Sequence, residues 1–150
     1  MPTFSISTHQ GSASEETAWI NQGLDTFNNA AAPLHEVQAL SCFAHTPLGK
    51  LIGGAIGRCW GSFCELQQLW VEPSLRRQGI GSQLVSAFET LAQKQGCTSF
   101  YLETFSFQAP KLYELLGYCV AYEHRMYPHG IVKYIMVKHQ THHSLDISKL

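Results

Sequence analysis

Charged residues are scarce in this sequence, and neither sign prevails. Asp, Glu, Lys and Arg make up 14% of the 150 residues, and 10 basic residues stand against 11 acidic ones. A protein that binds nucleic acid broadly needs a basic surface excess, so this balance argues against that class. Apolar residues make up 45% of the chain, which excludes disorder for most of its length.

Long apolar runs, a secretory leader and paired cysteines are also missing. No stretch of about 18 apolar residues occurs, as a membrane-spanning helix requires, and the first residues lack a basic segment followed by an apolar one. Five cysteines occur without a Cys-x-x-Cys pair, which favours buried thiols in a reducing compartment. Cys59, Cys64 and the scattered histidines match no compact ligand set, so we expect a cytoplasmic protein without a metal.

The length predicts one domain, over residues 1–138, followed by a loosely ordered tail at 139–150. Ser12–Glu15 fits a capping box for a first helix, which Ala30–Pro33 ends. Two further helices are expected at 78–95 and 109–116, and about seven strands at 3–8, 37–45, 51–60, 63–71, 98–105, 117–127 and 131–138. A strand–helix–strand crossover lies in the middle. This order indicates a mixed α/β sheet with helices on both faces.

The most informative segment runs from Leu66 to Leu84. A strand that Pro73 ends is followed by a basic loop with Arg76 and Arg77, and then by glycines at the start of an amphipathic helix. Free N–H groups and the helix dipole make such a start an anion site, and glycines let the backbone approach phosphate oxygens. A tight packing turn is the structural alternative.

Two phosphate-binding designs compete for this loop. A dinucleotide fingerprint could use Gly79-x-Gly81 with Glu103 on the next strand, but Leu84 replaces its third glycine. The other design is the hexapeptide Arg76-Arg-Gln-Gly-Ile-Gly81, which resembles the pyrophosphate loop of the GNAT superfamily of acetyl-CoA-dependent N-acetyltransferases. Leu69-Trp-Val-Glu-Pro73 resembles that family's fourth strand and its exit, and Ala109–Tyr118 resembles its closing Ala-x-x-x-Tyr-x-x-x-Gly-Phe motif. The resemblance extends over roughly residues 3–138.

The resemblance implies a single GNAT-like domain whose fourth and fifth strands splay apart to admit acetyl-CoA. It implies that the pyrophosphate lies on the backbone of the loop and that the pantetheine arm runs along the strand before it. The family often has Asn where this chain has Ser106, and Gln108 is the expected substitute. The implied cofactor-binding residues are Leu69, Trp70, Val71, Arg76, Arg77, Gln78, Gly79, Ile80, Gly81, Ser82 and Gln108.

The implied reaction is direct attack of an amine on the thioester. Tyr113 matches the tyrosine that the family uses as general acid toward the CoA sulfur, and the alternative for Tyr113 is a packed helix aromatic. A lysine-like amine must lose a proton before it attacks. Glu103 is the preferred base for that proton and Glu65 the runner-up, although either carboxylate could simply be a surface charge.

The acceptor is the least specified part of the sequence. The first helix, the loop after it and the last hairpin have many aromatic and His residues but few acids, which suits a small, modestly charged amine better than a polycation. A protein or peptide amine, or a non-catalytic acyl-CoA sensor on the same fold, are the alternatives. The edge of the last hairpin and the low charge favour a homodimer.

Overall fold

The computed structural model describes residues 2–140. Contacts divide the chain into two compact units, Met1–Glu36 and Val37–Leu150. The units are described separately below. No helix among the described residues is long and apolar enough to cross a membrane.

The N-terminal unit consists of α1, Ser14–Ala31, and the short 3-10 helix η1, Leu34–Glu36. The predicted strand at residues 3–8 is wrong, because this segment has no regular secondary structure. Alternating apolar and polar side chains define an apolar face for a strand, but they do not provide a neighbouring strand to which its backbone can hydrogen-bond. The capping box is also not formed, since the helix starts after Ala13 and no side chain caps it. The glutamates at 15 and 16 still favour this end through the helix dipole.

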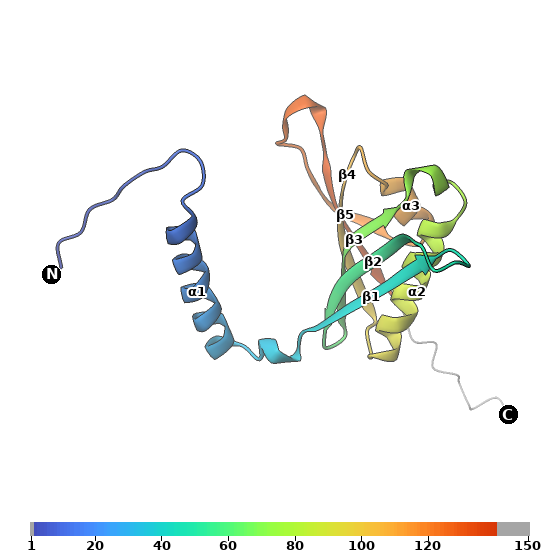
Figure 1. Ribbon diagram of the computed structural model, residues 1–150, viewed down its shortest axis with the longest axis horizontal. Helices are drawn as coiled ribbons and strands as arrows, with labels where there is room; N and C mark the ends of the chain where they lie inside the picture. Colours follow the sequence, from blue (N-terminus) through green and yellow to red (C-terminus); the bar gives the residue numbers. More distant parts are fainter. Residues whose placement is uncertain (1, 141–150) are drawn as a thin grey trace. The chain divides into compact units, whose positions relative to one another are not determined.

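The second unit contains a six-stranded sheet, one strand fewer than the sequence predicts (Figure 1). The order across the sheet is β1-β2-β3-β4-β6-β5. Its strands are β1 Gln38–His45, β2 Leu51–Trp60, β3 Phe63–Val71, β4 Ser99–Phe105, β5 Cys119–His124 and β6 Lys133–His139. All neighbours are antiparallel except β3 and β4. Two antiparallel halves, β1-β2-β3 and β4-β6-β5, therefore flank one parallel junction.

Helix α2, Ile80–Lys94, connects β3 to β4 and packs on β1, β2 and β3 (Figure 1). Its apolar face buries Leu84, Val85, Phe88 and Ala92. On the facing strand a Cβ at Gly57 would lie 2.0 Å from the carbonyl oxygen of Glu65 and 2.7 Å from Phe88. Only glycine lets helix and strand approach this closely. The crossover predicted from sequence is confirmed, because α2 joins the parallel strands β3 and β4.

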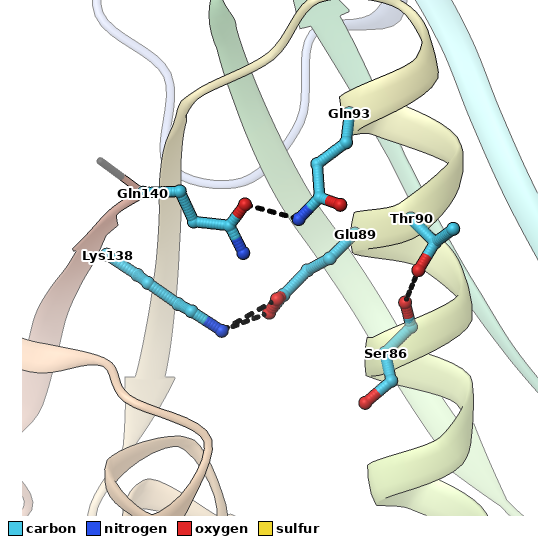
Figure 2. Close-up of polar contacts among 6 residues, drawn as sticks. All are labelled: Ser86, Glu89, Thr90, Gln93, Lys138 and Gln140. Carbon is cyan, nitrogen blue, oxygen red and sulfur yellow. Dashed lines mark hydrogen bonds and ion pairs between the residues drawn. The ribbon is translucent and has the colours of Figure 1, made fainter. Parts of the chain in front are cut away.

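A largely buried ion pair links α2 to β6, in the other half of the sheet (Figure 2). Lys138 on β6 donates to both carboxylate oxygens of Glu89, at 2.9 and 3.0 Å, and Glu89 is only 5% exposed. Beside them Gln93 donates to Gln140. The backbone N–H of Gln140 also donates to Thr98, so pairing continues past the predicted boundary at 138, whereas residues 141–150 of the predicted tail lie outside the described part.

The remaining elements bring the last third of the chain to the parallel junction. Helix α3, Pro110–Leu115, follows β4, and the 3-10 helices η2, Pro73–Leu75, and η3, Pro128–Gly130, lie in the β3–α2 and β5–β6 connections. The glycine after α3, Gly117, has φ +95°, which a left-handed helix end requires. These connections place the two predicted motifs, residues 69–81 and 109–118, at one end of the sheet.

Candidate functional site

The two parallel strands separate halfway along their length. β3 and β4 pair from Phe63↔Ser99 to Leu66↔Leu102, and no pairing follows. Residues 68–71 remain paired to β2 on their other edge, as β4 remains paired to β6. Two strand edges with free backbone groups therefore face each other, which is the splay that the resemblance implies.

A cleft of about 820 Å³ occupies the region between these edges and the start of α2. It gathers most of the residues expected from sequence and leaves out Gln78 and Glu65. The expected residues that line it are Leu69, Trp70, Val71, Arg76, Arg77, Gly79, Ile80, Gly81, Ser82, Glu103, Gln108 and Tyr113.

One pole of the cleft is a row of unused backbone donors. The N–H groups of residues 77 through 82 donate to no carbonyl of the described chain, and the first helical bond runs from Gln83 to Gly79. Arg77 and Gly79 have φ of +64° and +80°, and alternation of such conformations turns successive N–H groups toward one point. With the dipole of α2 behind them, these groups form a site for an anion.

The two arginines at this pole are engaged differently. The Nε of Arg76 donates to the carbonyl oxygen of Val71 at 2.9 Å, so this side chain ties the loop to the end of β3. Arg77 makes no ion pair or hydrogen bond within residues 2–140, which leaves its guanidinium available to a ligand. The sequence pattern predicts the same role for both arginines, and the hydrogen bond of Arg76 distinguishes their roles.

Gln108 closes the opposite wall. Its Oε1 accepts from the N–H of Phe105 at 2.8 Å and from the hydroxyl of Thr104 at 3.5 Å. The N–H of Ser106 donates to Val132 across the β6 edge, and N–H directions alternate along a strand, so the N–H of Phe105 points away from β6. The oxygen of Gln108 is thus used inside the chain, while its Nε2 retains two donors.

Ser106, at the position where the family often has Asn, is also engaged in hydrogen bonds within the chain. Its hydroxyl accepts from the N–H of Val132 at 3.1 Å, while its own N–H donates to the carbonyl of that residue at 2.8 Å. This reciprocal pair anchors the end of β4 to the start of β6. The serine side chain is therefore committed to the fold.

Tyr113 reaches the cleft from α3. The residue is 8% exposed, and its ring lies edge-on to Tyr118 with centroids 5.9 Å apart. The Nζ of Lys138 lies 5.6 Å from the Tyr118 centroid. Burial raises the pKa of Tyr113 above its ordinary value, which keeps the hydroxyl protonated at neutral pH. Among residues 2–140 that hydroxyl has no hydrogen-bonding partner, and it is not enclosed, so it is free to donate into the cleft.

Glu103 lies on the wall formed by β4, with two neighbours that the sequence did not reveal. The hydroxyl of Tyr101 donates to its Oε1 at 3.0 Å, and the Nζ of Lys133 lies 3.4 Å from its Oε2. Burial, followed by this hydrogen bond, raises the pKa of Tyr101. The period of two along β4 could have paired Tyr101 with Glu103, whereas Lys133 comes from a strand thirty residues later.

Glu65 occupies a different position. It lies beside Tyr101 in the β3–β4 register and accepts from Arg58 at 2.9 Å on the neighbouring strand. It does not line the cleft.

Residues 2–140 contain no group of three His, Cys, Asp or Glu side chains arranged to hold a metal ion.

Comparison with known proteins agrees with this geometry. Residues 8–118 match the acetyltransferase (GNAT) family. A blasticidin-S acetyltransferase from Streptomyces morookaense is 34% identical over 110 residues, which cover 71% of this chain and 81% of that protein. The chain belongs to the GNAT family of acetyltransferases.

Solved structures of acetyltransferases share the fold. An acetyltransferase from Bacillus cereus superposes with a TM-score of 0.73 at 26% identity, covering 89% of this chain and 97% of that one. A nourseothricin acetyltransferase superposes with a TM-score of 0.59 at 20% identity, covering 69% and 66% of the two chains. The family match encloses the free N–H row, the parted strands and Tyr113 within one segment.

Proposed function

We propose that this GNAT protein transfers the acetyl group of acetyl-CoA to a primary amine of a small molecule by direct attack. The observation that carries the proposal is one cleft that joins a row of free backbone donors to two parted strand edges. Tyr113 and Glu103 both line it. An anion site, an extended slot and two proton-transfer groups are together what an acyl-CoA and an amine need.

The cosubstrate is held chiefly by backbone groups in this proposal. The N–H groups of residues 77–82 and the free guanidinium of Arg77 bind the pyrophosphate. The unpaired edge at 69–71 receives the extended pantetheine arm, in the manner of an added strand. Gln108 contributes its Nε2 donors, because its oxygen is already engaged with Phe105. Arg76 acts indirectly, since it fixes the loop to Val71.

Glu103 removes the proton that the amine must lose, either directly or through water. The amine nitrogen then forms its bond to the thioester carbonyl carbon, the carbon–sulfur bond breaks, and the nitrogen loses its second proton to water. Tyr113 gives its hydroxyl proton to the departing thiolate and is reprotonated from solvent, so the products are an amide and CoA thiol. Because burial raises the pKa of Tyr113, the hydroxyl carries its proton at neutral pH and can act only as a donor in this step.

Glu65 is the weaker choice for the base. Its carboxylate is bound to Arg58 and lies outside the cleft, whereas Glu103 lines it.

The small-molecule acceptor is supported by the blasticidin-S acetyltransferase and the nourseothricin acetyltransferase among the similar proteins. Cytoplasmic location stays a prediction from the sequence.

A thiol-release assay with acetyl-CoA and a panel of amines that includes blasticidin S tests the proposal. Tyr113→Phe removes the acid and is expected to lower kcat by about 10²–10⁴-fold. Tyr122→Phe, the same change at an exposed β5 residue outside the cleft, is the control and should retain full activity. Bound CoA without turnover of any amine would instead favour the acyl-CoA sensor. An unchanged rate in Tyr113→Phe would remove the general-acid role.

We further propose that the protein forms a homodimer through the outer edge of the sheet. Among residues 2–140, β5 is the terminal strand and pairs only with β6, and Val120 and Tyr122 on it are exposed. An open edge with apolar side chains is a surface that a second chain can cover. Sedimentation velocity of the protein and of a Val120→Lys variant measures this, and a monomeric parent protein would refute it.

A further inference from the structure

A stack of aromatic rings stands at the end of the cleft where β4 finishes. The rings of Phe105 and Phe107 lie parallel, with centroids 5.3 Å apart and an interplanar angle of 8°. Tyr127 approaches Phe105 edge-on, also at 5.3 Å, with an interplanar angle of 82°. These residues come from the end of β4 and from the β5–β6 connection, the orange segment of Figure 1.

The inner ring of this stack is held from several sides. Lys133 Nζ lies 5.6 Å from the Phe105 centroid, and His124 lies 4.9 Å from Tyr127. The outer ring has no such cover within the described chain. Phe107 is 67% exposed and lines the cleft. A large apolar ring left open at a cleft, with one face already stacked, presents a flat surface to a ligand.

The stack adjoins the proposed proton acceptor. Side chains alternate along β4, so Phe105 and Glu103 project from the same face of the sheet. Lys133 confirms their proximity, because its ammonium lies 3.4 Å from Glu103 and also over the Phe105 ring. A planar group stacked on Phe107 can therefore carry an amine toward Glu103.

Charge at this end limits the acceptor further. Glu103 is the one carboxylate that lines the cleft within the described residues, and Lys133 already partners it. A second ammonium on the acceptor would meet Lys133 and no unpaired carboxylate. Polycations need paired acids, which this wall does not provide.

We infer that the acceptor is a monoamine attached to a flat aromatic or heteroaromatic ring, and that this ring stacks on the outer face of Phe107. The inference rests on the proposed acetyl transfer and specifies its substrate class. Phe107 is then a specificity-determining residue: it selects for planarity, while the amine is presented to Glu103 and the thioester.

The experiment compares two amines of equal length and similar basicity, phenethylamine and 2-cyclohexylethylamine, with spermidine as a polycation. The wild-type protein is expected to show kcat/KM about two- to twelvefold higher for the planar ring than for the saturated one, the range for one aromatic pair. Spermidine should be the poorest substrate. Phe107→Leu keeps an apolar side chain without a flat face, so it should abolish the preference by lowering kcat/KM more for phenethylamine than for the cyclohexyl amine.

Phe43→Leu, at an exposed phenylalanine on β1 that does not line the cleft, is the matched control and should keep the preference. Equal kcat/KM for the two amines, or an equal loss for both in Phe107→Leu, would overturn the inference.

A binding measurement separates this inference from the proposed reaction. Saturation-transfer NMR of phenethylamine with the CoA-loaded protein should give a ring signal that Phe107→Leu removes. If that signal appears while no amine is acetylated, the proposed reaction fails and the ring site stands. If amines are acetylated but the signal and the preference are absent, the reaction stands and the ring site is refuted.

Discussion

The buried pair of Glu89 and Lys138 allows a sharp test of what joins α2 to the sheet. Glu89 is 5% exposed, and its carboxylate accepts two hydrogen bonds from an ammonium whose side chain is 21% exposed. Lys138→Met leaves the carboxylate buried without its cation. Loss of one partner from a buried pair costs about 3–5 kcal/mol, a large share of the ~5–15 kcal/mol that stabilises a domain.

The expected shift in melting temperature follows from the size of the chain. At about 2–4 °C per kcal/mol for a chain of this length, Lys138→Met should melt roughly 6–20 °C below the parent protein. Urea unfolding followed by circular dichroism gives the free energy of unfolding directly. The same variant removes the cation over Tyr118, the ring against which Tyr113 packs, so kcat should fall as well.

Two comparisons make this prediction refutable. The double variant Glu89→Met/Lys138→Met removes both charges, and replacing a whole buried pair by apolar groups is often neutral or stabilising, so it should recover most of the loss. Arg125→Met breaks the exposed pair with Glu123, whose side chains are 66% and 40% exposed, and should cost less than about 1 kcal/mol. A Lys138→Met loss as small as that of Arg125→Met, or a double variant no better than the single one, would contradict the reasoning.

Two further predictions concern pH and the anion pole. Burial raises the pKa of Tyr118 and that of Cys64, the latter to about 12. In the unfolded chain these groups ionise at about 8.5–10. The stability that the neutral buried groups contribute is therefore complete below that range and is lost as pH rises through the pKa values of the folded state. Urea midpoints should therefore fall between about pH 9 and pH 12, less steeply at first in Cys64→Ala, and a flat midpoint to pH 11 would be inconsistent with it. At Gly81 a Cβ would lie 3.7 Å from Leu112, an ordinary contact, so Gly81→Ala should keep or raise stability by up to about 1 kcal/mol. Gly81→Phe should lower CoA affinity at least about tenfold by filling the cleft, as calorimetry would measure, and retained affinity would refute the assigned pose.

Local patterns predicted the central elements well. The two strands on either side of Gly61 have the predicted bounds. Alternation and turn residues act over a few neighbours, and each of these strands is the other's partner in one hairpin. The strand predicted at residues 3–8 had the same alternation and is absent. A strand requires a neighbouring edge to bond to, and no local pattern supplies that.

The anion pole was predictable for the same reason. Glycines, a basic loop and a helix start are adjacent in the sequence, so their chemistry can be read from residues 76–82 without the fold. By contrast, the side-chain partners of the cleft are distant in sequence. Lys133 meets Glu103 only because β6 pairs with β4, and the wall around Phe107 exists only because the last hairpin returns to that edge.

The amino-acid sequence alone determined the class of this protein, a near-neutral α/β domain of the acetyltransferase family, and it predicted one loop for pyrophosphate binding and one tyrosine for proton donation. Tertiary structure alone decided which donors remain free. Arg76 already donates to the carbonyl oxygen of Val71, and the oxygen of Gln108 already accepts from the N–H of Phe105. Glu103 lines the cleft and Glu65 does not. The physical reason is that hydrogen bonds and ion pairs depend on distances of a few ångströms between groups far apart in the chain. Composition and spacing specify which groups exist, and packing determines which of them are already satisfied.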